Sequence, residues 1–295
     1  MLDAPRRCAA MRRGSMRAVG DPEIETMTYL IELAAWSLLA FFLLLLVLQV
    51  VSREVGYAIG VARARRKDEK DEGVSLVVSS VLALTVFVMA LSLSLSVSRN
   101  DERRSGAMNE ANAIGTAWLQ AKAIDHPRAA VIAKLLEQYA RQRVDFVQAE
   151  HGSARIEAAN TATSALQTEI WGHLSVLVRE LPGPLTTSMM NSLNGTFDAS
   201  TAMRFAMGYR MAPQLAWLLL LLNLAGMAVL GYQFGLQGKR HPVMATLMSV
   251  LWTAVLVGIL DIGSPRLGLF RTDVAAYEWN QQGFTDIPTP AIAPN

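Results

Sequence analysis

Five polar side chains in one stretch of the sequence have the types and spacings that would suit ion conduction. Intervals of seven, four, three and four residues place them on one face of an α-helix. They are Thr85, Ser92, Ser96, Arg99 and Arg103. In an oligomer this stripe would line a pore, and its arginines would draw anions to the mouth.

The same stripe has a purely structural interpretation. Serine and threonine hydroxyls inside a membrane commonly bond to carbonyls of their own helix, or leave room for a neighbouring helix. Ser94 and Ser98 lie on another face, so the hydroxyls of this stretch are not confined to one stripe. That distribution favours the structural interpretation.

A second polar group follows further along the same stretch. Glu110 and Asn112 stand among alanine and glycine residues, where a carboxylate can pair with an arginine of a later helix, either Arg204 or Arg210. The functional interpretation is an ion or gating site just outside the membrane. The structural interpretation, which we favour, is an ion pair between two helices.

The last part of the chain adds one more candidate for this polar network. Asp261 closes the fourth apolar run, so it is either solvated or paired with Arg266 or Arg271. Glu110, Asn112, Arg204, Asp261 and Arg266 are therefore the predicted members of a gating or structural network.

The sequence offers little for enzyme chemistry. None of the four histidines has a second histidine or cysteine at metal-ligand spacing, and the single cysteine, Cys8, excludes a multi-cysteine site. The sequence contains no nucleophile elbow, phosphate loop or dinucleotide fingerprint. We therefore expect no enzyme activity, catalytic residue, metal or cofactor. A net charge of +2 without a basic, aromatic patch excludes nucleic acid as a partner.

Long apolar runs must position the polar groups. Charged residues make up only 18% of the chain and the mean hydropathy is +0.27, which is typical of several membrane spans with one soluble part. The uncharged run 74–98 is long enough to cross a hydrocarbon core of about 30 Å. It continues without a proline to Ile124, which predicts a membrane helix that leaves the bilayer as a stalk. Three further spans are predicted at 27–51, 213–235 and 242–261.

These spans divide the chain into five parts. They are a disordered basic tail at 1–26, transmembrane helices one and two at 27–98 with a connecting loop at 53–73, a soluble helical bundle at 99–212, transmembrane helices three and four at 213–262, and an irregular tail at 263–295. The basic tail either addresses anionic lipid or precedes a translation start at Met16 or Met27.

The soluble part has helical periodicity and no strand pattern. Breaks at 125–127, near Gly152 and at 181–184 give four helices when the stalk is included, and Pro127 suits a first helical turn. An apolar stripe from Ile156 to Leu181 forms a coiled-coil-like seam, which a bundle core explains. The fold class is therefore all-α, with a helical bundle inserted between spans two and three.

The charges bear on orientation. Four spans place both termini and the bundle on one side of the membrane. The two short loops on the other side hold eight lysines and arginines, which favours cytoplasmic loops and an extracytoplasmic bundle. The basic N-terminal tail argues for the reverse.

Several segments resemble one family. The run EANAIGTAWL, from Glu110 to Leu119, followed by RAAVIAKLLEQYARQRV, is similar to a bestrophin-like family of bacterial membrane proteins with no assigned activity. REVGYAIG, LNGTFDASTAMR and LDIGSPRLGLFR follow the family's order, so the resemblance spans residues 27–271. Two positions depart from it. Gly263, Ser264 and Pro265 stand where the family more often has Asp-Arg-Pro, and Met203 replaces a basic residue beside Arg204.

The resemblance implies two membrane helix pairs with a helical insertion between them. True bestrophins are pentameric anion channels of related arrangement with a cytosolic insertion, on the side opposite to the one that the charges favour. We expect a multi-pass protein of the bacterial inner membrane that contacts the lipid bilayer and forms a homo-oligomer. It is either an anion channel or transporter whose second span lines a pore, or a non-transporting structural or sensing protein whose bundle binds a partner.

Overall fold

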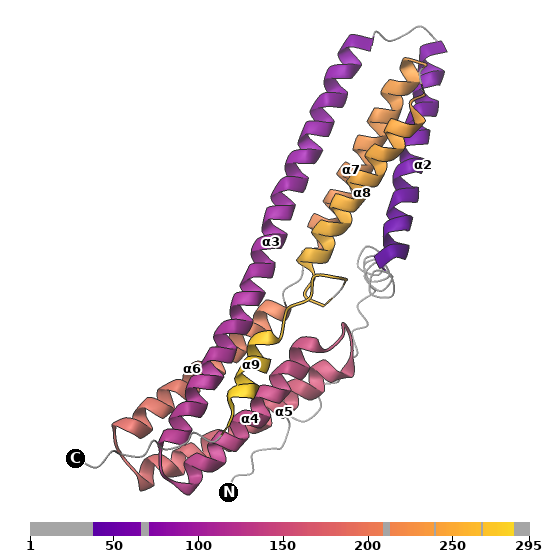
Figure 1. The fold of residues 1–295 in the computed structure, drawn as a ribbon. Coiled ribbons are helices and arrows are strands. Elements are labelled where there is room, and N and C mark those ends of the chain that lie inside the picture. The colour runs from indigo at the N-terminus through magenta and orange to yellow at the C-terminus, as the bar shows by residue number, and fades with distance from the viewer. Residues whose placement is uncertain (1–37, 66–70, 209–212, 239, 267, 286–295) are drawn as a thin grey trace, which may run out of the picture.

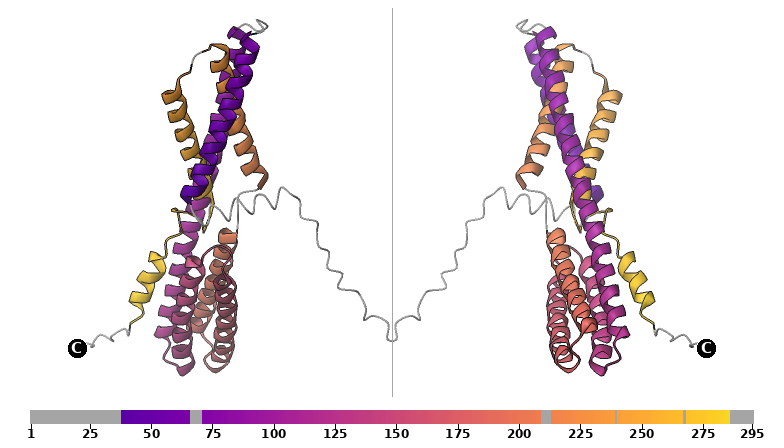
Figure 2. Two further views of the ribbon diagram at one scale, coloured as in Figure 1. Left: turned by 90° about the vertical axis from the view of Figure 1, so that its right-hand side faces the viewer. Right: turned by 90° about the vertical axis from the view of Figure 1, so that its left-hand side faces the viewer.

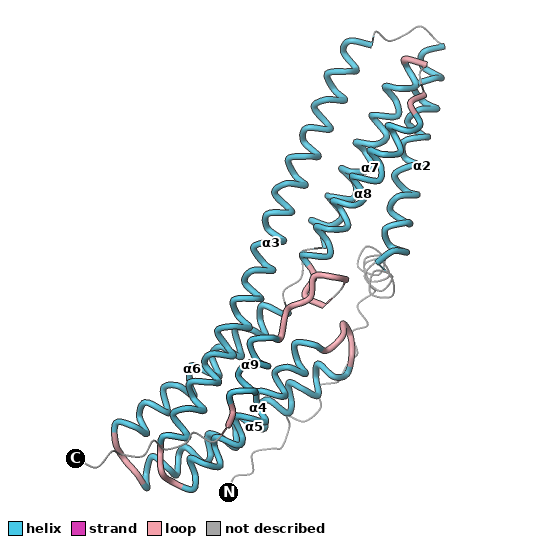
Figure 3. Tube along the Cα trace, in the orientation of Figure 1, coloured by secondary structure: helices cyan, strands magenta, loops and turns pink. Residues whose placement is uncertain are grey.

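The computed structural model describes residues 38–285, apart from 66–70, 209–212, 239 and 267. The predicted tail at 1–26 and the first part of the first span lie outside these residues. The described helices are α2 (Leu38–Arg65), α3 (Asp71–Ala123), α4 (Pro127–Gln148), α5 (Ala154–Glu180), α6 (Pro184–Gly208), α7 (Pro213–Leu236), α8 (Pro242–Gly263) and α9 (Ala275–Gly283). Figure 3 shows turns and loops at the described connections, such as those between α4 and α5 and between α5 and α6.

The molecule is elongated, with apolar helices at one end and a helical bundle at the other (Figures 1 and 2). Four helices, α2, α3, α7 and α8, are long and apolar enough to cross a membrane. Helix α3 has 53 residues and extends from the apolar helices into the bundle. At 1.5 Å per residue, its length is about 80 Å. The all-α fold, with four candidate membrane helices and a bundle inserted between the second and third, is confirmed.

The first membrane helix is longer than the sequence predicts. We predicted a connecting loop at 53–73, but α2 continues through 53–65 and ends at Arg65, so the prediction is wrong for those residues. The extra turns pack on α7, where the Ser52 hydroxyl donates to the carbonyl of Leu224 over 2.7 Å. That contact gives the polar turns a partner beyond the apolar run.

Glycines bring α2 and α7 into backbone contact along those turns. A Cβ atom at Gly56 would lie 1.9 Å from the carbonyl oxygen of Ala228, and one at Gly231 would lie 2.1 Å from that of Arg53. Gly60 and Gly235 meet the opposite helix equally closely. The register is constant, because residues 52, 56 and 60 meet 224, 228 and 232, so the two helices run parallel. Small residues at such spacing are the usual basis for close helix packing in membranes.

The bundle is built from the lower half of α3 together with α4, α5 and α6, as predicted. Pro127 occupies the first turn of α4, and the His126 ring accepts a hydrogen bond from the Arg128 backbone N–H over 3.2 Å. The apolar stripe of α5 is buried at Ile170, Leu174 and Leu177. A bundle core thus explains the stripe.

The C-terminal segment contains a helix that the sequence analysis missed. We predicted an irregular tail at 263–295, but residues 275–283 form α9, which packs against α3 and α4. Tyr277 of this helix is fully buried. The helix forms between Pro265 and Pro288, and burial of Tyr277 stabilises a segment too short to be helical by itself.

Candidate functional site

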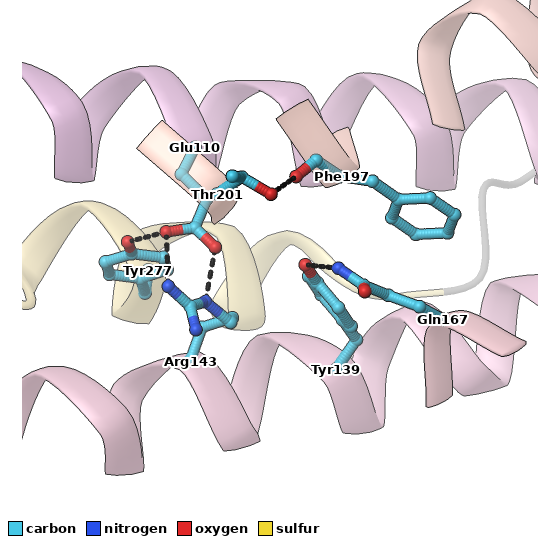
Figure 4. Close-up of polar contacts among 7 residues, drawn as sticks. All are labelled: Glu110, Tyr139, Arg143, Gln167, Phe197, Thr201 and Tyr277. Carbon is cyan, nitrogen blue, oxygen red and sulfur yellow. Dashed lines mark hydrogen bonds and ion pairs between the residues drawn. The ribbon is translucent and has the colours of Figure 1, made fainter. Parts of the chain in front are cut away.

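A buried ion pair and a tyrosine join three helices where α3 leaves the membrane end of the molecule. The Arg143 guanidinium of α4 donates from Nε and Nη2 to the two carboxylate oxygens of Glu110 in α3, the Nη2 contact measuring 3.2 Å. The Tyr277 hydroxyl of α9 donates to Glu110 Oε2 over 2.6 Å. Figure 4 shows the carboxylate between its two partners. All three side chains are buried, so water does not compete for these hydrogen bonds.

Burial and charge shift the pKa values of this cluster. Burial, followed by the negative charge of Glu110, raises the pKa of Tyr277 far above its ordinary range and keeps the phenol protonated. Burial alone would lower the pKa of Arg143, but the charge and hydrogen bonds of Glu110 outweigh it and the pKa is raised. The cluster is therefore a fixed ion pair with a neutral hydrogen-bond donor.

Three further contacts of tyrosine and arginine side chains extend the cluster along α4. Tyr139 is buried one turn before Arg143, and its hydroxyl accepts a hydrogen bond from Gln167 Nε2 over 3.1 Å (Figure 4). Arg143 also stacks on the Phe146 ring, with 4.5 Å between Cζ and the ring centroid. Arg266 contacts the same ring at 4.9 Å.

The segment EANAIGTAW is the surface on which α9 rests. Beyond the Tyr277 contact to Glu110, the Asn280 amide donates to the carbonyl of Ala111. A Cβ atom at Gly115 would lie 2.9 Å from Asn280 Oδ1, so the glycine leaves the space that Asn280 needs. Trp118 meets Phe284 with ring centroids 5.1 Å apart. The residues that carry the family resemblance therefore hold the C-terminal helix in place.

The predicted hydroxyl stripe of α3 lies inside the protomer. Thr85, Ser92 and Ser96 are all buried. The Thr85 and Ser92 hydroxyls donate to the carbonyls of Val81 and Val88, each over 2.8 Å, in their own helix. These contacts match the structural interpretation of the stripe, and pore lining by these residues stays a prediction.

The two arginines of the stripe differ from each other. Arg103 is buried, and its Nη2 donates over 2.7 Å to the carbonyl of Ile262, in the last turn of α8. This bond ties α3 to α8 where the membrane helices meet the bundle. Arg99 is partly exposed, and its guanidinium forms a 2.7 Å ion pair with Glu102.

The predicted polar network is divided between several places. Glu110 pairs with Arg143 and not with Arg204, which is exposed at the surface of α6. The alternative partner, Arg210, lies outside the described residues. Asn112 is exposed on α3. The expected ion pair between helices thus exists, but with an arginine that we did not predict.

Asp261 and Arg266 also have partners other than each other. The Asp261 carboxylate accepts from the Leu269 backbone N–H at 3.1 and 3.2 Å. Arg266 Nη1 donates to the carbonyls of Phe146 and Ala149, at 2.8 and 2.7 Å, and so caps the C-terminal end of α4. Within the segment that follows α8, Asp261 therefore fixes the turn at Leu269, and Arg266 attaches the segment to the end of α4.

Sequence reasoning missed Arg143 and Tyr277. Arg143 follows Tyr139 by four residues and precedes Phe146 by three, so helical spacing already placed it on the buried face of α4. Tyr277 stands in a segment whose prolines predict an irregular tail, so the sequence gives no signal for its burial. Among the described residues, no three histidine, cysteine, aspartate or glutamate side chains come together as a metal site.

The helices together form an all-helical fold of bestrophin-like architecture, with four helices that could cross a membrane. The structure is similar to the crystal structure of a bacterial bestrophin homolog from Klebsiella pneumoniae that carries a tyrosine-to-alanine mutation, with a TM-score of 0.61 and 14% sequence identity. The match covers 82% of this chain and 97% of that one. No protein-family model matches the chain, and no curated protein matches it. The likeness establishes the fold.

Proposed function

We propose that the protein is a homo-oligomeric, bestrophin-like anion channel in which α3 lines the conduction path. The observation that carries the proposal is the outward face of α3, opposite the buried stripe. Ser94 and Ser98 are exposed there in the membrane half of α3, which also exposes Ser79 and Ser80, and Asn112 and Thr116 are exposed 18 residues after Ser94 and Ser98. Eighteen residues make five helical turns, so these pairs point in the same two directions. In a ring of protomers, this face would provide hydroxyl and amide donors for anions.

Cysteine accessibility separates the outward face from the predicted stripe. In a Cys8→Ser background, Ser94→Cys and Ser96→Cys differ by two positions on one helix, and only Ser94 is exposed in the protomer. We expect a charged thiol reagent to reduce chloride flux into liposomes strongly for Ser94→Cys and little for Ser96→Cys. The reverse result would assign the pore to the Thr85, Ser92 and Ser96 face. A folded oligomer without any chloride flux, or a protein that is monomeric in detergent, would exclude the channel.

A non-transporting structural or sensing protein is the second candidate. Its supporting observation is a set of large apolar side chains exposed on the bundle and on α9: Trp171, Leu185, Phe205 and Trp279. Large exposed aromatic and aliphatic side chains can contribute to contact with another protein. This candidate predicts no flux, together with cross-links from the bundle to a different protein.

For localisation we propose the bacterial inner membrane with the bundle on the extracytoplasmic side, following the charges of the short loops. Single cysteines at Ala64, on the loop side, and at Ala165, on the bundle, would both replace exposed residues. A membrane-impermeant thiol reagent added to intact spheroplasts should label Ala165→Cys and spare Ala64→Cys. Labelling of Ala64→Cys alone would reverse the orientation.

A further inference from the structure

A basic pocket lies where the end of α4 meets the segment that follows α8. It has a volume of about 400 Å³. Three of its lining residues are arginines, Arg155, Arg266 and Arg271, and Glu150 is the single carboxylate among them. Two of the arginines come from beyond α8 and the third from the first turn of α5, so the pocket forms only when these segments fold together.

Arg266 is a fixed cation at the back of this pocket. It is buried, and its Nη1 is held by the last carbonyls of α4 while its guanidinium rests against Phe146. Within the described part of the chain it pairs with no carboxylate. Burial, and secondarily the charge of Arg143, lower the pKa of Arg266 to about 10, so it remains charged at neutral pH. A buried cation that faces an open pocket attracts an anion.

The segment that carries two of the arginines follows α8 directly and so lies next to the membrane helices. Arg266 follows the end of α8 by three residues. Gly268 has φ +65°, and a Cβ atom there would collide with the Asp261 carboxylate that binds the Leu269 N–H. This turn presents Leu269 and Phe270 to the outside, 82% and 49% exposed, between Arg266 and Arg271. Apolar side chains flanked by arginines at the end of a membrane helix suit the lipid headgroup region.

We propose that this pocket binds a phosphate group, supplied either by the headgroup of an anionic lipid or by a soluble phosphomonoester. A phosphodiester headgroup offers two nonbridging acceptor oxygens and a phosphomonoester offers three, and an arginine fork matches two such oxygens with paired hydrogen bonds. Arg266 would hold the phosphate with its buried guanidinium, and exposed Arg271 and Arg155, which makes a 3.4 Å ion pair with Asp145 in this structure, would add further charged hydrogen bonds. The site is separate from the outward face of α3, so it does not depend on the channel proposal.

Direct binding to the full-length protein in detergent tests the site. Isothermal titration would use dioctanoyl phosphatidylglycerol, glycerol 3-phosphate and, as the probe without phosphate, dioctanoylglycerol. Arg155→Glu and Arg271→Glu change exposed residues, and Arg179→Glu makes the same charge change at the far, exposed end of α5. We expect each pocket variant to weaken binding roughly tenfold or more, because each loses a charged hydrogen bond, and we expect Arg179→Glu to bind like the wild type.

The probes identify the source of the phosphate. Equal binding of glycerol 3-phosphate and the lipid would assign a soluble phosphomonoester. Binding of the lipid alone, weakened by a Leu269→Ser and Phe270→Ser double variant, would assign a headgroup. The proposal is wrong if both pocket variants bind as the wild type does, if Arg179→Glu weakens binding equally, or if dioctanoylglycerol binds as well as the phosphate probes.

Discussion

Glu110 and Arg143 depend on each other, because each is the counter-charge of the other in a buried place. Removing one partner of such a pair leaves an unpaired charge away from water, which costs about 3–5 kcal/mol. We therefore expect Glu110→Gln to lower the thermal midpoint of unfolding substantially. Circular dichroism of the detergent-solubilised protein would measure the loss.

A double-mutant cycle separates the pair from the individual side chains. When Arg143→Met accompanies Glu110→Gln, no charge remains buried, so the double variant should be more stable than the sum of the two single losses predicts. Exposed Arg141→Met on the same helix is the control and should be nearly neutral. Strictly additive losses would show that the pair is not coupled.

Tyr277 should make stability depend on alkaline pH. Its pKa in the folded protein is raised above the ordinary value of 10.0, so the unfolded chain releases this proton first. Its contribution to stability is complete below about pH 10 and falls as the pH rises further.

Tyr277→Phe should be less stable at pH 7, by roughly 1.5–3 kcal/mol for the lost hydrogen bond to a charged group. The variant should then lose less stability than the wild type between pH 9 and 11. Parallel pH curves for the two proteins would contradict the burial of an ionisable phenol beside Glu110.

The sequence predicts which residues share a face better than where that face points. Helical spacing groups Thr85, Ser92 and Ser96, and all three are buried in the protomer. Spacing alone does not supply the neighbour of that face: the Thr85 hydroxyl lies 3.5 Å from the carbonyl of Leu222 in α7, more than a hundred residues away. Glu110 was likewise identified as an ion-pair residue. Its partner was not, because Arg143 looked like one more charge on a helix with several.

At the level of helices, the contact between α2 and α7 predicts that a glycine-to-alanine substitution destabilises the protein there, although the same substitution elsewhere in a helix is neutral or stabilising. In an exposed helix position glycine is worse than alanine by about 1 kcal/mol. Among the described residues, no neighbouring group lies within 4 Å of the place that a Cβ atom would take at Gly258 of α8, so Gly258→Ala should leave stability unchanged or raise it. Gly56→Ala would place a methyl group 1.9 Å from a carbonyl oxygen of α7 and should lower the unfolding midpoint by several degrees. If Gly56→Ala is as stable as Gly258→Ala, the two backbones are not in contact.

Helices that carry their own apolar run were predictable, and those that depend on a partner were not. The run 74–98 and its proline-free continuation correctly predicted α3 as a helix with a membrane half and a stalk. The turns of α2 at 53–65 contain charged residues and glycines, which alone indicate a loop. The nine residues of α9 are helical because Tyr277 and Asn280 reach α3. Local sequence contains neither of these partners.

For the molecule as a whole, the continuity of α3 is the property that links the membrane end to the bundle. Proline inside a helix removes one hydrogen bond and costs about 3 kcal/mol. Asp101 is exposed in α3, where the helix passes from its membrane half into the bundle. Asp101→Pro should therefore unfold the helix locally, while Asp101→Ala should leave it intact. Trypsin would report the difference at Arg103 and Arg104, with a cleavage rate roughly 100-fold faster in the proline variant. Equal cleavage of the proline and alanine variants would show that α3 is already open at this point.

The two helices that form the contact between α2 and α7 are synthesised at different times. Gly56 emerges from the ribosome about 175 residues before Gly231, which at 5–20 residues per second is roughly 10–35 seconds. During that interval α2 has reached the membrane without the helix that covers it. The buried side chain of Gln49 and the polar turns around Arg53 then face lipid or an insertion factor. The nascent chain is therefore most vulnerable while its soluble bundle is still being made.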